Sequence, residues 1–288
     1  ILAGIVLGPT LLGATLSETL TPLPVRPVLG VLATVGLILF MFLTGIEYDR
    51  RRVAGRAGQA VALAFLSVAV PALVGFPVAG ALHNSTFAGP ASNDLLPFAM
   101  FIGALLSITA FPVMAHILME RGELNSSLGT LAVASAGFMA LFMFGYLAAA
   151  IAVARADGVT PLLLQFVMIL LLGVASWWVV RPLVRRALRH GLEGDRIRGD
   201  AVALVFGGLM LYGLIADRLG IHAMLGGFIW GLLLPEAPAL RQALASRVRD
   251  VTMVLFLPVF FAVAGFAADL KLLTAGSLFA LLLLLLAA

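Results

Sequence analysis

Two hydroxyl side chains stand beside a proline in the middle of a long apolar stretch that reads Ser107-Ile-Thr109-Ala-Phe-Pro112-Val. Proline removes a backbone donor and its ring clashes one turn back, whereas serine and threonine can satisfy the freed groups. The pattern predicts a helix broken from Ser107 to Phe111. A break in mid-membrane would expose carbonyls and helix-dipole ends, which can hold an ion. A simple proline kink is the alternative.

Three hydroxyl groups are candidates for the wall of such a site: Ser107, Thr109 and, in the following apolar stretch, Ser135. Hydroxyl and carbonyl oxygens can replace the hydration shell of a cation. The same side chains can instead hydrogen-bond only the neighbouring backbone. The residue types alone leave both interpretations open.

The titratable candidates lie nearer the ends of the apolar stretches. Glu47 and Asp49 stand beside a run of arginines at 50–52, and they form either a solvated cluster at the membrane surface or a place where protons or ions enter. His116 lies one turn beyond Pro112, and imidazole titrates near neutrality. It is interpreted either as a proton carrier or as a histidine bonded to a neighbouring helix.

Composition restricts the class of protein that could position these groups. Of the 288 residues, 62% are hydrophobic and 11% are charged, whereas soluble domains carry about 25% charged residues. A water-soluble fold is therefore excluded. The chain has no cysteine, and its four histidines are scattered, so neither a metal nor another cofactor is expected. No Walker, HExxH or GxSxG motif supports enzymatic chemistry.

The charges fall in clusters separated by apolar runs near or above the roughly 20 residues that a membrane-spanning helix needs. The sequence therefore predicts an all-α polytopic membrane protein of about ten spans. The predicted spans are 1–16, 29–47, 57–82, 95–119, 126–154, 159–180, 200–216, 219–235, 250–268 and 272–288.

The basic residues support this set of spans, because they collect in alternate loops. Of the 18 basic residues, 14 lie in the loops after the second, fourth, sixth and eighth predicted spans. The other four are Arg26, Arg155, Arg218 and Lys271. Under the positive-inside rule the arginine-rich loops are cytoplasmic. The net charge of +4 is thus interpreted as a topology signal rather than as a nucleic-acid-binding face. The basic stretch 181–198 could also contact anionic membrane lipid.

Two segments recur along the chain in the same order. Gly4-Ile-Val-Leu-Gly8 matches Gly227-Phe-Ile-Trp-Gly231, and the segment 40–49 matches 260–269. The first and eighth predicted spans start on opposite sides of the membrane, so the copies would be inverted. Inverted repeats are a transporter architecture with a site near the midplane. Small residues are also common wherever membrane helices pack, which is the alternative explanation.

The sequence resembles the bacterial monovalent cation:proton antiporters of the Kef type, the second cation:proton antiporter family. The residues that carry the resemblance are Ala3-Gly4-Ile-Val-Leu-Gly8-Pro9, Phe42-Leu-Thr-Gly45-Ile-Glu47-Tyr-Asp49, Thr109-Ala-Phe-Pro112-Val, Leu128-Gly-Thr-Leu-Ala132, Gly226-Gly-Phe-Ile-Trp-Gly231 and Leu257-Pro258-Val-Phe260-Phe261-Ala-Val-Ala-Gly265.

This resemblance implies an inverted-repeat fold of about 13 helices, with broken helices crossing at the ion site. It implies a secondary transporter, not an enzyme, that exchanges Na⁺ or K⁺ for H⁺ as a homodimer in the bacterial inner membrane. Residues 1–288 would be one partial exchanger transmembrane domain, truncated at both ends and lacking the first helix and the last ones.

The sequence departs from the family pattern in the span at 126–154. Alignment on Leu128-Gly-Thr-Leu-Ala132 places Met139 and Ala140 where the family carries an acidic pair or an Asn and an Asp. Two functions therefore remain open. One is exchange, with the acid supplied elsewhere or with weakened coupling. The other is a non-transporting derivative that binds, senses or acts on an apolar ligand.

Overall fold

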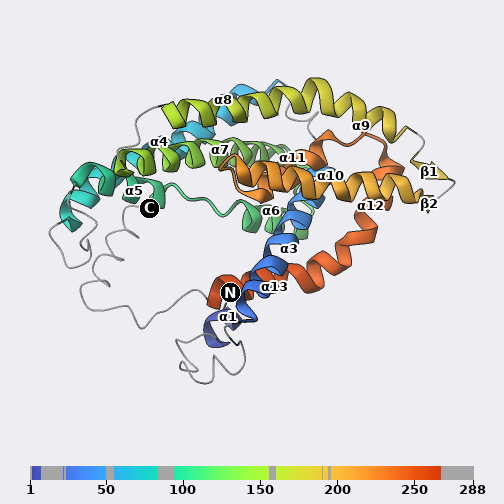
Figure 1. The fold of residues 1–288 in the computed structure, drawn as a ribbon, viewed down its shortest axis with the longest axis horizontal. Coiled ribbons are helices and arrows are strands. Elements are labelled where there is room, and N and C mark those ends of the chain that lie inside the picture. Colours follow the sequence, from blue (N-terminus) through green and yellow to red (C-terminus); the bar gives the residue numbers. More distant parts are fainter. Residues whose placement is uncertain are drawn as a thin grey trace. The chain divides into compact units, whose positions relative to one another are not determined.

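The computed structural model describes residues 2–7, 22, 24–49, 55–83, 94–155, 160–189, 191–193 and 196–266. These residues are almost entirely helical, with one short antiparallel hairpin that pairs Leu192 with Ile197 and Glu193 with Arg196 (Figure 1). The elements are α1 (Leu2–Leu7), α3 (Arg26–Glu47), α4 (Ala57–Leu82), α5 (Leu95–Leu106), α6 (Phe111–Glu120), α7 (Ser127–Arg155), α8 (Thr160–Ala175), the π-helical turn η3 (Ser176–Val180), α9 (Arg181–Ala187), β1 (Leu192–Glu193), β2 (Arg196–Ile197), α10 (Gly199–Arg218), α11 (Ala223–Leu233), α12 (Pro238–Val251), the π-helical turn η4 (Thr252–Phe256) and α13 (Leu257–Phe266).

Within the described residues, seven helical stretches are long and apolar enough to cross a membrane. They confirm the prediction of an all-α polytopic membrane protein. The stretches are Arg26–Glu47, Ala57–Leu82, Leu95–Glu120, Ser127–Ala154, Leu163–Ala187, Gly199–Arg218 and Pro238–Phe266. The predicted span at 272–288 and most of the span at 1–16 lie outside the described residues.

Two predicted spans have the wrong limits. The span predicted at 219–235 is the 11-residue helix α11, which is about 16 Å long and too short to cross the hydrocarbon alone. The span predicted at 250–268 is part of a helix that begins at Pro238, so Arg241 and Arg249 lie on a helix and not in a loop. Charge-free runs cannot reveal such an extension, because an amphipathic helix keeps its charges on one face.

The helix predicted at 159–180 likewise continues to Ala187 and carries Arg181 and Arg185 on its last turns. Arg181 stacks on the Trp177 ring, 3.9 Å from its centroid, and both arginines approach the carboxylate of Glu236 at about 3.5 Å. These arginines therefore belong to a folded helix end.

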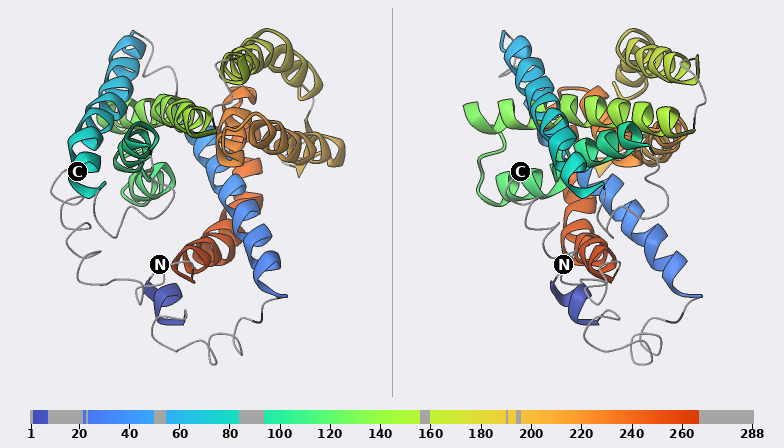
Figure 2. Two further views of the ribbon diagram at one scale, coloured as in Figure 1. Left: turned by 60° about the vertical axis from the view of Figure 1, so that its left-hand side comes forward. Right: turned by 90° about the vertical axis from the view of Figure 1, so that its left-hand side faces the viewer.

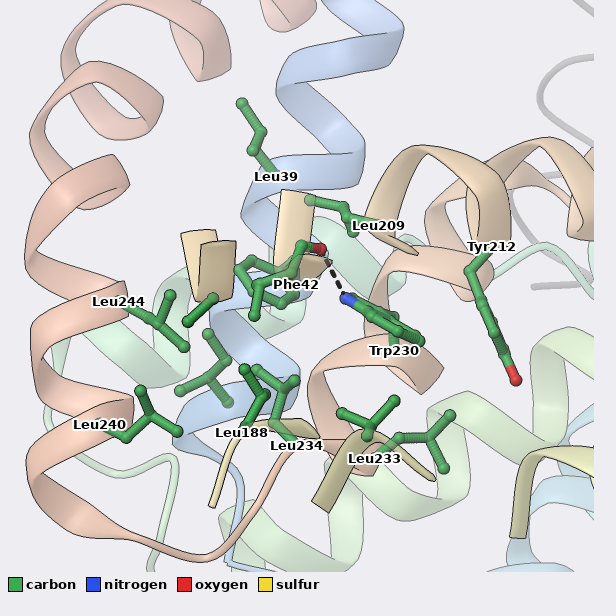
Figure 3. Packing of buried hydrophobic residues seen from close by; sticks show 14 of the residues in the cluster. Leu39, Phe42, Leu188, Leu209, Tyr212, Trp230, Leu233, Leu234, Leu240 and Leu244 are labelled. Atoms are coloured by element: carbon green, nitrogen blue, oxygen red, sulfur yellow. Dashed lines mark hydrogen bonds between the residues drawn. The ribbon is translucent and has the colours of Figure 1, made fainter. Parts of the chain in front are cut away.

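The chain divides into two compact units. Unit 1 comprises residues 1–48 and 171–271, and unit 2 comprises 49–170 and 272–288. In unit 1, α3 packs on α11, α12 and α13, and α11 packs on α10. The core of this unit contains Phe42, Leu209, Tyr212 and Trp230 (Figure 3). The Trp230 indole N–H donates to the Val205 carbonyl at 2.8 Å.

The repeated segments contact each other crosswise within unit 1. Gly4 of α1 lies directly against the Ala262 carbonyl and Gly265 of α13. Gly231 of α11 lies in the same way against the Phe42 carbonyl and Gly45 of α3, which are the repeat counterparts of Ala262 and Gly265. Figure 1 shows α1 beside α13. The two helix pairs therefore pack through corresponding segments but one turn out of register, because the repeat counterpart of Gly4 is Gly227, which lies against the Ile38 carbonyl.

In unit 2, α4 packs on α5 and α7, and α5 also contacts α7 (Figure 2). Gly75 of α4 and Gly103 of α5 let the two backbones touch, because a Cβ at either position would collide with the other helix. Small residues at such crossings are typical of membrane helices. The contact fixes α5 just before the predicted break.

Candidate functional site

The helix predicted to break does so. Helix α5 ends at Leu106, residues 107–110 leave the helical conformation, and α6 begins at Phe111 with Pro112 in its first turn (Figure 1). Proline suits a first turn, where its missing N–H has no intrahelical partner. A simple kink is excluded, since four residues lie between the two helices. The broken helix is the element around which the candidate site is built.

Ser107, the first residue of the break, is buried with 1% of its surface exposed. Its hydroxyl oxygen lies 2.7 Å from the Gly103 carbonyl and 3.0 Å from the Val68 carbonyl of α4. The single hydroxyl proton is donated to these carbonyls, so Ser107 holds the end of α5 against α4. This geometry favours the backbone-bonding interpretation for Ser107.

Thr109 connects the break to α7. Its hydroxyl donates to the Met139 sulfur at 3.0 Å, while its own carbonyl accepts from the Phe111 N–H at 2.9 Å. Met139 and Ala140 are both buried, and Met139 packs with Ala64 and Val68 of α4. The structure thus brings Thr109 next to the position at which the resemblance implies an acidic or amide side chain.

Ser135 lies one helical turn before Met139 on α7. Its hydroxyl oxygen is buried and has no hydrogen-bond partner among the described residues. Sequence reasoning missed a second such hydroxyl, that of Tyr146, which packs on the Met139 cluster from two turns further along α7. The spacing of seven residues from Met139 is the signal that could have identified it, because residues i and i+7 share a helix face.

His116 lies on α6, one turn beyond Pro112, with its Nε2 atom 3.3 Å from a carboxylate oxygen of Glu120 on the same helix. Glu120 is well exposed, and His116 is about one quarter exposed. The pair marks the end of α6 that is distant from the break. His116 is therefore paired within its own helix, seven residues beyond Thr109 in the sequence.

Glu47 and Asp49 belong to different units. Glu47, at the end of α3, forms an ion pair with Arg249 of α12. Arg241 of α12 donates to the Ile46, Leu234 and Pro235 carbonyls at 2.7–3.1 Å. In unit 2, the Asp49 N–H donates to the Asn125 side-chain oxygen at 2.9 Å. The arginines at 50–52 lie outside the described residues.

An open cleft of about 460 Å³ lies beside the Glu47 pair, and its lining includes Arg241, Gln242, Ser246 and Asp250. Its charged groups are of both signs, and the two arginines are already engaged with Glu47 and with backbone carbonyls. These contacts favour the structural interpretation of Glu47 over a role in ion uptake.

Neither the break nor α7 carries a carboxylate. The sequence from residue 124 to 154 contains no aspartate, glutamate, histidine, lysine or arginine. Within the described part of the chain, no group of three histidine or acidic side chains could hold a metal ion. What the site offers chemically is hydroxyl oxygens, the backbone carbonyls of the break and one thioether.

A polytopic helical bundle with a helix interrupted inside its apolar stretch is the architecture of a membrane transporter. The chain matches the sodium/hydrogen exchanger transmembrane family over residues 1–288, and it belongs to that family. The family is one of ion exchangers and not of enzymes.

Several curated relatives are similar to the chain. It is 33% identical over 291 residues to the Na(+)/H(+) antiporter NhaS4 of Synechocystis, covering 100% of this chain and 71% of that protein. It is 32% identical over 280 residues to Cation/H(+) antiporter 20 of Arabidopsis thaliana, covering 93% and 33% of the two chains. It is 30% identical over 289 residues to K(+)/H(+) antiporter 1 of Saccharomyces cerevisiae, covering 96% of this chain and 32% of that protein. The chain therefore spans about a third of the plant and yeast relatives.

Proposed function

We propose that the protein is a secondary transporter that exchanges Na⁺ or K⁺ for H⁺ across a membrane. The observation that carries the proposal is the break at residues 107–110, where Thr109 contacts Met139 of α7. The names of the relatives support it, since they include an Na(+)/H(+) and a K(+)/H(+) antiporter. The broken backbone offers carbonyl and hydroxyl oxygens, which suit a monovalent cation that has lost part of its water.

Proton coupling requires a titratable group, and none of the residues from 124 to 154 has an acidic or basic side chain. The proposal therefore assigns the proton-carrying group to a segment other than α7. A buried carboxylate in a membrane is costly and is retained for function, so its place in the protein decides how tightly exchange is coupled.

Flux measurements on the full-length protein in proteoliposomes test the proposal. Under an imposed pH gradient, we expect proton flux that depends on Na⁺ or K⁺. Met139→Asp should accelerate this flux, because it adds a carboxylate beside the Thr109 hydroxyl. Leu141→Asp is the matched control, since it puts the same charge on α7 two residues from Met139 and therefore on another side of the helix. Wild-type vesicles without cation-dependent flux would refute exchange.

A second function has an observation in its favour. The Thr109 hydroxyl donates to a thioether, and Met139 is packed with Ala64, Val68 and Phe142 in an apolar cluster. This apolar environment suits an apolar ligand better than a bare cation. Saturable binding of an apolar small molecule by a protein that shows no flux would support a non-transporting derivative of the exchanger fold.

The proposal extends to assembly and location. We place the protein as a homodimer in the inner membrane of a bacterial cell, in contact with lipid, consistent with the cyanobacterial relative and with the exposed apolar side chains of α8 such as Leu170. Mass photometry of the protein in nanodiscs should give the mass of two chains. A single-chain mass at all concentrations would refute the dimer.

A further inference from the structure

One face of α7 carries polar atoms for which the described protein provides no partner. Ser135, Met139 and Tyr146 are spaced by four and seven residues, so they line up along the helix. The oxygens of Ser135 and Tyr146 are both buried and lack a hydrogen-bond partner among the described residues. Met139, between them, accepts the Thr109 hydroxyl. Two unpaired hydroxyls therefore flank the contact between α7 and the break.

The Tyr146 hydroxyl lies over the backbone of α5 at Gly103. A Cβ atom at position 103 would be 2.8 Å from the Tyr146 oxygen, so only glycine leaves room for it there. Gly103 lies one turn before the break, and its carbonyl accepts from the Ser107 N–H and hydroxyl. The Tyr146 oxygen is thus placed on the α5 side of the break, next to the backbone turn that ends at Ser107.

A buried hydroxyl without a partner demands an explanation, because nearly all such groups in native proteins are hydrogen-bonded. A phenol has one proton to donate and lone pairs to offer. The α7 face has no basic residue between 124 and 154 that could attract an anion, and its other groups are a thioether and hydroxyl oxygens. A neutral face whose polar atoms are hydroxyl oxygens and a thioether suits a cation better than an anion.

We infer that Tyr146 is a ligand of the transported monovalent cation, on the section of α7 that leads from Met139 toward Arg155. This inference depends on the proposed exchange. The cation leaves the break along the α7 face, with the Tyr146 oxygen replacing one water of its hydration shell. Ser135 provides the corresponding oxygen on the other side of Met139. Tyr146 thereby contributes to affinity for the cation, while the break remains the central site.

The variant Tyr146→Phe tests this role, because it removes one oxygen and keeps the ring that packs against the cluster of Ala64, Val68 and Met139. In proteoliposomes of the full-length protein, the Na⁺ or K⁺ concentration for half-maximal flux should rise about three- to tenfold, as expected for loss of one ligand. The maximal rate should stay close to wild type. Tyr212→Phe is the matched control, since the Tyr212 hydroxyl is already bonded to Ser176 at 2.8 Å in unit 1.

A second measurement uses the wild-type chain. Tyrosines can be replaced by 3-fluorotyrosine, and the chain has three of them. Titration with NaCl or KCl should shift the fluorine resonance that disappears in Tyr146→Phe, and it should leave the Tyr212 resonance in place. Choline chloride at equal ionic strength is the control for salt effects.

The outcomes separate the inference from the proposed function. Wild-type flux with an unchanged half-maximal concentration in Tyr146→Phe overturns the role of Tyr146 and leaves exchange intact. A cation-dependent Tyr146 resonance without flux supports the ligand and overturns exchange. Absence of both flux and a cation-dependent shift overturns both.

Discussion

One tyrosine hydroxyl in each unit is inaccessible to solvent or hydrogen-bonded inside the protein, and the two differ in their partners. In unit 1 the Tyr212 hydroxyl is bonded to Ser176, which itself donates to the Leu172 carbonyl at 2.6 Å. In unit 2 the hydroxyls of Ser135 and Tyr146 lack partners among the described residues. Unit 1 has an exception in Thr252, whose hydroxyl is also buried without a partner. Unit 2 in turn has a bonded hydroxyl in Ser107, so the contrast is between the two tyrosines, Tyr212 and Tyr146.

The difference agrees with the proposed division of roles, in which unit 1 is rigid and the α7 face of unit 2 binds the cation. A satisfied polar pair fixes the positions of its two helices, because separating them would leave each group unpaired in an apolar environment. Under the proposal, the unpaired hydroxyls of the α7 face lower the stability of the cation-free protein and gain a partner when the cation binds. We therefore expect changes in unit 1 to affect folding, and changes on the α7 face to affect cation dependence.

The largest expected effect concerns the close contact between α3 and α11. In Gly231→Ala the added Cβ would lie 2.6 Å from the Phe42 carbonyl oxygen and 2.9 Å from Gly45, so the backbones must separate. Overpacking of this kind costs about 3 kcal/mol. Thermal unfolding in detergent should show a drop in Tm of several degrees.

Gly207→Ala on α10 is the control for Gly231→Ala, because nothing lies within 4 Å of a Cβ at position 207. It should keep or raise Tm, since alanine favours a helix over glycine by about 1 kcal/mol. Equal losses in the two variants would show that the close contact does not hold the pair together.

The second effect compares two tyrosines that lose the same atom. Tyr212→Phe removes the bond to Ser176 and should lower stability by about 1 kcal/mol, or about 2–4 °C in Tm. Tyr146→Phe removes a hydroxyl that has no protein partner, so in cation-free buffer its Tm should equal or exceed that of wild type. A matching loss in Tyr146→Phe would mean that its hydroxyl is satisfied in the empty protein, and the contrast between the units would fail.

Sequence reasoning predicted the break because its cause is local. Pro112 cannot continue a helix from residue 108, and the hydroxyls of Ser107 and Thr109 stand where freed backbone groups need partners. The spans at 29–47 and 57–82 were also predicted, since Glu47 ends α3 and Arg56 precedes α4, although α3 begins earlier than predicted, at Arg26. The start of α12 at Pro238 was not predicted. The helix continues from a charged segment into an apolar one without interruption, so the change in composition near residue 250 does not mark its beginning.

The contacts of the site depend on tertiary structure that no local pattern encodes. Thr109 and Met139 are 30 residues apart, and only the family resemblance pointed to position 139. Tyr146 in an apolar run suggests packing in the core. Its unpaired hydroxyl follows from the approach of α7 to Gly103, which spacing along one helix cannot reveal.

The smallest effect concerns pH and lies in unit 1. His222 precedes α11, and its Nδ1 atom accepts from the Met224 N–H at 3.3 Å. Partial burial lowers the pKa of His222 below its ordinary value of about 6.5, and the Asp217 carboxylate opposes this shift. With the pKa depressed in the folded state, the unfolded state binds the proton more readily. The stability that neutral His222 contributes is therefore fully present above about pH 6.5, and it is lost as the pH falls toward the lower pKa of His222 in the folded protein.

His222→Asn separates the cap from the titration. An asparagine oxygen can still accept a backbone N–H at the start of α11 but does not titrate in this range. Lowering the pH from about 7.5 to about 5.5 should therefore reduce Tm by a smaller amount in the variant than in wild type, since only wild type loses its acceptor on protonation. If both proteins lose the same amount, the acid sensitivity arises from another group and the α11 cap is independent of pH.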